Sequence, residues 1–111
     1  MIFITQGRYT RDAMAAMVAR PEDRGKEARK LIEAAGGKFL GSYFTFGDYD
    51  FAVISEFDDP QAATPALIAA AAGGSLEGVR TTIGMQWSDG RAAFEKTAKL
   101  AKSFRSAGQK K

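Results

Sequence analysis

Apolar residues recur along this chain with two alternating periods, and the order of those periods most constrains the fold. Alternation every two residues predicts four strands, over 2–6, 38–46, 51–57 and 78–87. Helical spacing predicts the elements between them: a helix after the cap Thr10, one from Pro21 to the Gly36-Gly37 pair, and one from Asp59-Pro60 to Gly73-Gly74. A last helix is expected from Ser88-Asp89 to about Ser106.

The resulting order is β-α-β-β-α-β with an additional C-terminal helix. This order is typical of the ferredoxin-like α+β fold, in which an antiparallel sheet carries its helices on one face. The chain has 111 residues, which is the size of one domain. We therefore predict a ferredoxin-like domain over residues 1–87, followed by a C-terminal helix and tail over 88–111.

Both faces of the predicted sheet are apolar. In the second strand, Phe39 and Tyr43 are expected on one face, with Leu40, Phe44 and Phe46 on the other. The helices can cover only one face, and a large exposed apolar patch marks an interface. We expect two sheets to meet face to face in a homodimer; the alternative is that the C-terminal helix covers the second face.

Two residue types are absent, and their absence excludes much common chemistry. The sequence has no His and no Cys. Ser-His-Asp and Cys-His catalysis, His-ligated haem, disulfides and Cys-ligated zinc are therefore excluded. We expect no cofactor and no metal site.

The net charge of +3 is distributed unevenly. Residues 90–111 hold seven basic residues and one acidic residue, so the rest of the chain is mildly acidic. In the last helix, apolar residues such as Phe94 and Leu100 fall on one side, and Lys96, Lys99 and Lys102 fall on the other. Nucleic-acid binding through this basic helix is not favoured, because stacking sites need aromatic and basic residues together.

The sequence also bears on localisation. It begins without a basic segment followed by a long apolar run, and no stretch reaches the roughly 20 apolar residues of a membrane helix. We expect a cytoplasmic protein without a transmembrane segment.

One stretch carries a family resemblance. The residues Thr45-Phe-Gly-Asp-Tyr-Asp50, followed by Phe-Ala-Val-Ile-Ser-Glu56, resemble the signature of the GYD domain family. The segments 27–37, 58–63 and 78–82 also look like parts of that family. The resemblance covers about Ile2 to Trp87 and implies a small bacterial protein with a ferredoxin-like, dimeric α+β barrel fold, without implying an activity.

The turn after the second strand holds the first candidate site. Asp48, Tyr49 and Asp50 place two carboxylates and a phenol together, and this combination suits a general base with a hydrogen-bond donor. The structural interpretation is that Gly47 and Asp48 form the turn while Asp50 binds backbone amides.

The second candidate site is a ligand-binding set near the last strand. Arg80 could bind an anion beside Thr82 and Gln86, and the aromatic side chains of Tyr43 and Trp87 could line an apolar pocket. The structural interpretation is a surface ion pair for Arg80 and core or interface packing for the aromatic residues.

Three functions are consistent with these features. The first is a homo-oligomeric module that binds a small apolar or aromatic molecule or serves in assembly. The second, of a kind that the resemblance to the dimeric α+β barrel class implies, is a cofactor-free monooxygenase or isomerase that uses Asp50 or Asp48 and Tyr49 with Arg80. The third is nucleic-acid binding through the C-terminal helix.

Overall fold

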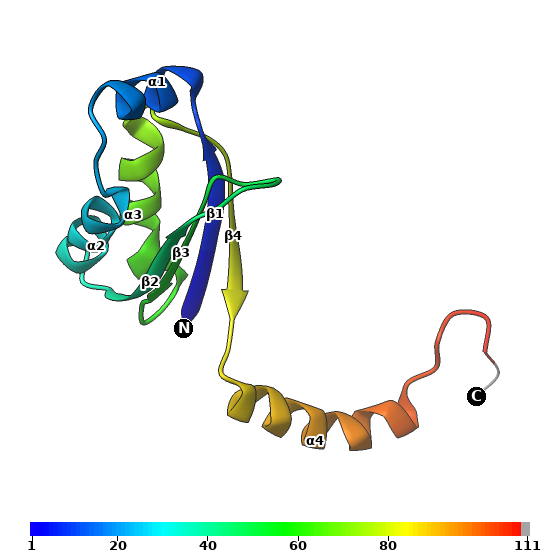
Figure 1. The fold of residues 1–111 in the computed structure, drawn as a ribbon. Helices are drawn as coiled ribbons and strands as arrows, with labels where there is room; N and C mark the ends of the chain where they lie inside the picture. Colours follow the sequence, from blue (N-terminus) through cyan, green and yellow to red (C-terminus); the bar gives the residue numbers. More distant parts are fainter. Residues whose placement is uncertain (110–111) are drawn as a thin grey trace.

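The structure, a computed structural model, describes residues 1–109 and contains the elements in the predicted order (Figure 1). The strands are β1 (Ile2–Tyr9), β2 (Lys38–Phe44), β3 (Phe51–Glu56) and β4 (Leu76–Gly84). The helices are α1 (Arg11–Ala19), α2 (Arg24–Ala34), α3 (Pro60–Ala72) and α4 (Trp87–Ser103).

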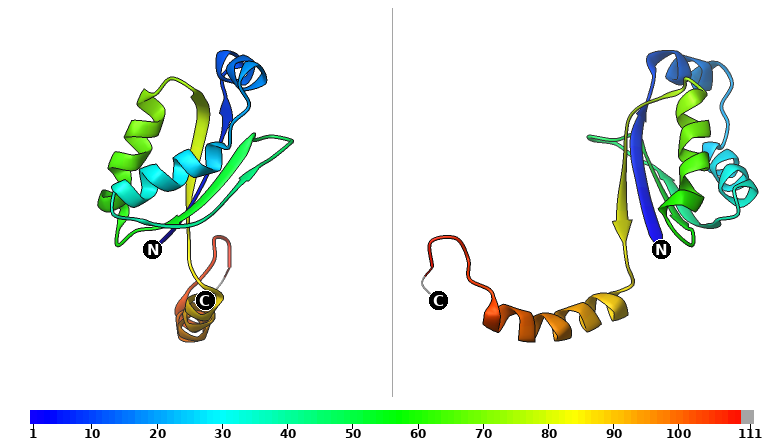
Figure 2. Two further views of the ribbon diagram at one scale, coloured as in Figure 1. Left: turned by 60° about the vertical axis from the view of Figure 1, so that its left-hand side comes forward. Right: turned by 180° about the vertical axis from the view of Figure 1, so that it is seen from behind.

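The four strands form one antiparallel sheet in the order β2-β3-β1-β4. In the register, Ile4 lies between Ile54 of β3 and Thr82 of β4. Both α2 and α3 lie on one face of this sheet, and the opposite face carries no helix (Figures 1 and 2). The predicted ferredoxin-like α+β architecture with an additional C-terminal helix is confirmed.

Three helices begin at side-chain caps that the sequence provides. Thr10 Oγ1 accepts the Ala13 amide at 3.2 Å, and Asp59 Oδ1 accepts the Ala62 amide at 2.8 Å, as these positions predicted. The predicted start of α2 at Pro21 was wrong. The cap is Asp23, whose Oδ1 accepts the Gly25 amide at 2.9 Å, so Pro21 precedes the helix.

The core lies between the sheet and the two covering helices. Its buried members come from β1, α2, the end of β3 and α3: Phe3, Ile32, Phe57, Ala63 and Ala66. The Phe3 and Phe57 rings meet edge to face with centroids 5.9 Å apart. The small alanines of α3 allow this helix to approach the aromatic rings closely.

Two strands depart from simple alternation. The β1–β4 register shifts between Gln6 and Arg8, where β4 has one extra residue, and the pairing resumes so that β1 reaches Tyr9 instead of ending at Gln6 as predicted. The β2–β3 register shifts between Phe39 and Gly41. That shift puts Phe39 and Tyr43 on opposite faces, so their predicted shared face was wrong.

The ends of two strands and the start of the last helix also differ from the prediction. The last strand ends at Gly84, and Trp87 begins α4, whose N-cap is Gln86 rather than Ser88. Likewise β2 ends at Phe44, which leaves Phe46 in the following loop. Edge strands lose their pairing gradually, so apolar alternation can continue beyond the last paired residue.

Helix α4 leaves the body of the domain and points away from it (Figure 1). The radius of gyration is 18.5 Å, whereas a compact chain of this length would have about 13 Å. The uncovered sheet face is therefore not covered by the chain's own C-terminal helix. None of the helices in residues 1–109 has the length and apolar character needed to span a membrane.

Candidate functional site

A cavity of about 510 Å³ lies between the sheet and helices α2 and α3. This volume falls within the usual range for small-molecule sites, roughly 300–1,000 Å³. Its walls come from the helix-covered face of the sheet and from the helix sides that face it. They are mainly apolar and include Phe3, Phe51, Val53, Leu31, Ile32, Leu67, Ala66, Ala70 and Val79.

The apolar walls are interrupted by a few polar groups. Thr5, Ser42 and Ser55 line the sheet side, and the Thr5 hydroxyl lies 3.2 Å from the Thr81 hydroxyl. Gly7 is packed beneath the Phe51 ring, where a side chain would collide with it. Sparse polar groups among apolar walls are suited to orienting an apolar ligand.

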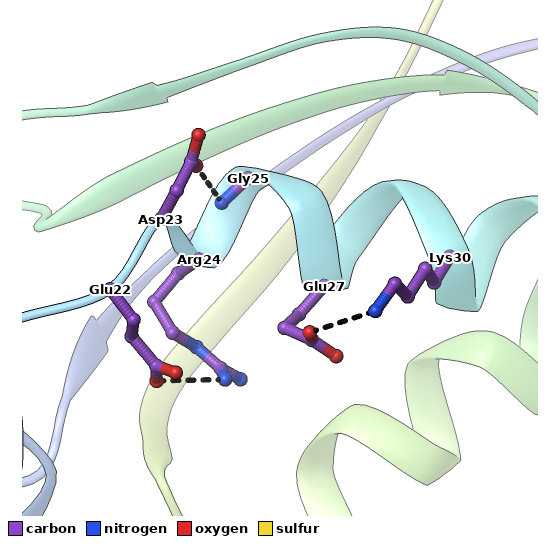
Figure 3. A network of polar contacts seen from close by, with 6 residues as sticks. All are labelled: Glu22, Asp23, Arg24, Gly25, Glu27 and Lys30. Carbon is purple, nitrogen blue, oxygen red and sulfur yellow. Dashed lines mark hydrogen bonds and ion pairs between the residues drawn. The ribbon is translucent and has the colours of Figure 1, made fainter.

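One end of the cavity gathers polar side chains from β1 and the start of α2. Tyr9 packs on Phe51 with ring centroids 5.2 Å apart. Arg24 Nη1 lies 3.2 Å from Glu22 Oε1, and both side chains border the cavity (Figure 3). Burial raises the pKa of the Tyr9 hydroxyl, and the nearby positive charge of Arg24 partly opposes this shift.

A smaller cavity of about 250 Å³ adjoins this polar end. It shares Tyr9, Glu22, Arg24 and Ser75 with the larger cavity, and α1 contributes its other wall. Both cavities therefore meet at Tyr9 and Arg24. An apolar ligand with one hydrogen-bonding group would place that group here.

The predicted catalytic turn lies outside both cavities. Asp50 Oδ2 accepts the Tyr9 amide at 3.0 Å, and the Asp50 amide donates to the Gly7 carbonyl at 2.8 Å. Arg8 Nη1 donates to the Asp48 carbonyl at 3.0 Å, and Thr45 Oγ1 donates to the Tyr49 carbonyl. These contacts attach the turn to β1, and Asp50 holds the backbone of Tyr9, which lines the cavity.

A comparison with family models matches the GYD domain over residues 3–94, which is most of the sequence. The chain belongs to the GYD domain family. A search of the curated proteins found no match. The matched span includes the sheet except Ile2, together with the beginning of α4, so it contains the cavity and nearly all of the uncovered face.

Most of the predicted ligand-binding residues of this GYD domain lie outside the cavity. Arg80 and Thr82 pair with Gln6 and Ile4, so they lie on the uncovered sheet face. Tyr43 borders the cavity, but its ring lies on the uncovered face beside Gly41.

Gln86 and Trp87 lie beyond the sheet, at the start of α4. The structure therefore does not gather this predicted set around one cavity. The binding and catalytic roles assigned to it and to the turn stay predictions.

Sequence reasoning missed Tyr9 and Arg24, the residues at the polar end of the cavity. The strand predicted over residues 2–6 leaves Tyr9 outside it, whereas β1 extends to Tyr9. Reading the alternation Phe3, Thr5, Gly7, Tyr9 through the glycine would have found it. Across residues 1–109, carboxylates form no group of three or more that could hold a metal ion.

Proposed function

We propose that this GYD domain binds a small apolar or aromatic molecule in the cavity between its sheet and helices. The observation that carries the proposal is the cavity itself, which has apolar walls and one polar end at Tyr9 and Arg24. The ligand's apolar body would lie against Phe51 and Val53, and a polar substituent would reach the Tyr9 hydroxyl.

A matched pair of substitutions on α3 tests ligand binding. Ala70 lines the cavity, whereas Ala72, the last residue of the same helix, does not. With 1-anilinonaphthalene-8-sulfonate as an apolar fluorescent probe, we expect one site per chain. Ala70→Phe should fill the cavity and weaken probe binding at least tenfold, while Ala72→Phe should leave it unchanged; equal binding by both variants contradicts the proposal.

We also propose that the protein is a cytoplasmic homodimer in which the uncovered sheet faces pack against each other. This face carries Ile2, Ile4, Ala52, Ile54 and Tyr43, and no helix of the chain covers it (Figure 2). Apolar faces of this kind are stabilised by burial in an interface.

Two isoleucines provide a matched test of the dimer. Ile54 lies on the uncovered face, and Ile68 is exposed on α3, which covers the opposite face. In sedimentation velocity, the wild type and Ile68→Asp should be dimers, and Ile54→Asp should be a monomer. Tyr43→Asp, at a more exposed position of the same face, should give the same result if Ile54→Asp fails to fold. A monomeric wild type would overturn the proposal.

A further inference from the structure

Helix α4 presents an apolar side that no other part of residues 1–109 covers. Its residues Trp87, Phe94 and Ala101 fall in one sector at about 100° per residue. The side chains of Trp87 and Phe94 are 85% and 70% exposed. An amphipathic helix of 17 residues gains most of its stability from packing that side against another surface.

Helix α4 also projects in an informative direction. It extends from the end of β4 on the side of the uncovered sheet face, away from α2 and α3 (Figures 1 and 2). The loop between β2 and β3 projects on the same side from the other end of the sheet (Figure 1). Phe46 in this loop is 94% exposed. The uncovered face is thus flanked by two projections that carry exposed aromatic side chains.

The charge distribution indicates what fits between these projections. Residues 90–111 hold seven basic residues and one acidic residue, whereas residues 1–89 hold nine basic and twelve acidic residues. Within α4 itself, four basic residues stand against two acidic ones, so the helix has a modest positive charge that is opposite in sign to the acidic body of a second copy of this chain. Such complementarity favours association of unlike surfaces.

Interface area supports the same occupant. A four-stranded sheet with strands of about seven residues offers a flat face of roughly 450 Å² per copy. A standard-size interface buries about 800 Å² of accessible surface per partner, and the accessible surface of a pleated face is larger than its flat area. One side of a 17-residue helix adds on the order of 250 Å², and in a two-fold dimer each copy both contributes and receives one such helix. Exchange of α4 brings the interface to the usual size.

We propose that α4 is an exchanged arm: in the homodimer, the α4 of each copy packs its apolar side against the body of the other copy. The inference rests on the proposed sheet-to-sheet dimer. It adds that α4 is part of the interface rather than a free basic helix. Its apolar residues bind the partner, while Lys96, Lys99 and Lys102 stay at the edge of the contact or in solvent.

The same substitution, alanine to aspartate, made on the two sides of α4 tests whether its apolar side contacts the partner. Ala101 lies in the apolar sector with Phe94, and Ala92 lies among the lysines on the opposite side. In the full-length protein, Ala101→Asp should raise the dimer dissociation constant at least tenfold, measured by sedimentation equilibrium. Ala92→Asp should change it less than twofold. At concentrations where both variants are dimers, circular dichroism should show the same strand content and the same folded domain in both.

The single tryptophan supplies an independent readout, because Trp87 is the first residue of α4. Diluting the protein through its dissociation constant should shift the Trp87 emission to longer wavelength as the indole becomes exposed. In Ile54→Asp, the emission should be that of an exposed indole at every concentration.

The outcomes separate failure of the arm from failure of the dimer. A monomeric wild type overturns both proposals. A dimer that Ile54→Asp disrupts, but that Ala101→Asp and Ala92→Asp leave equally stable, overturns the arm alone. The arm is also overturned if the Trp87 emission does not change on dilution but shifts to shorter wavelength with vesicles of anionic phosphatidylglycerol, because α4 would then be a membrane-surface helix.

Discussion

The two faces of this sheet have the same kind of apolar strands but different surroundings. The face under α2 and α3 buries Phe3, Phe51 and Phe57 and encloses a cavity of about 510 Å³. The other face bears Ile4, Ile54 and the Tyr43 ring and is flanked only by α4 and the β2–β3 loop. Apolar alternation shows that both faces need a cover, and it does not show which cover each one receives.

The largest expected effect is on stability, when an aromatic side chain of the helix-covered core is truncated and compared with one in the exposed β2–β3 loop. Phe57→Ala should reduce the free energy of unfolding by about 3–5 kcal/mol, because Phe57 is 5% exposed and packs on Phe3. Phe46→Ala should change it by less than about 0.5 kcal/mol in the single chain. Urea unfolding of both variants in the Ile54→Asp background, where no dimer is expected, measures the difference; similar losses would remove the distinction between the two regions.

A smaller effect is expected at the turn that connects the two faces. Asp50→Ala leaves the half-buried Tyr9 amide without its carboxylate partner and should cost about 1–3 kcal/mol of unfolding free energy. Asp48→Ala should cost less than about 0.5 kcal/mol, because in the described part of the chain only its carbonyl, and not its carboxylate, accepts a hydrogen bond.

The same two substitutions bear on the predicted catalytic role of the turn. If Asp50→Ala weakens binding of the fluorescent probe and displaces the Tyr9 ring, the role of Asp50 is to position Tyr9. An enzymatic activity that Asp48→Ala abolishes without loss of stability would favour the catalytic interpretation instead.

The smallest effect concerns the polar end of the cavity. The pKa of Tyr9 is raised by burial, so the unfolded chain loses this proton at lower pH than the folded protein does. The contribution of Tyr9 to stability is therefore complete below pH 10 and decreases as the pH rises towards its folded pKa. Thermal unfolding from pH 8 to pH 11 should show a steeper decline in the wild type than in Tyr9→Phe; parallel curves would mean that the hydroxyl is fully solvated.

Local signals predicted most of the fold. The caps at Thr10 and Asp59, and the stops at Gly36 and Gly74, act over one helical turn and are present in the sequence itself. The glycines have φ values of 88° and 78°, which other residues rarely adopt. The order of elements, and with it the ferredoxin-like architecture, followed from these signals.

The candidate site was less predictable, because two bulges decide which side chains face the cavity. The extra residue in β4 opposite Gly7 lets both Leu76 and Val79 line the cavity although they are three positions apart, and the shift near Leu40 separates Phe39 from Tyr43. A shift of one residue exchanges the two faces of a strand. Alternation in the sequence contains no mark of where such a shift occurs.

The sequence by itself determined the strand and helix order, the two apolar sheet faces, the exclusion of histidine and cysteine chemistry, and the concentration of positive charge after Gly90. Only the tertiary structure decided that the cavity lies under α2 and α3, that Tyr9 and Arg24 form its polar end, and that α4 leaves the second face uncovered. The physical reason is the separation along the sequence of the residues that interact. Helix caps and apolar periodicity depend on residues a few positions apart. Strand register and the direction of a projecting helix depend on pairings between distant parts of the chain.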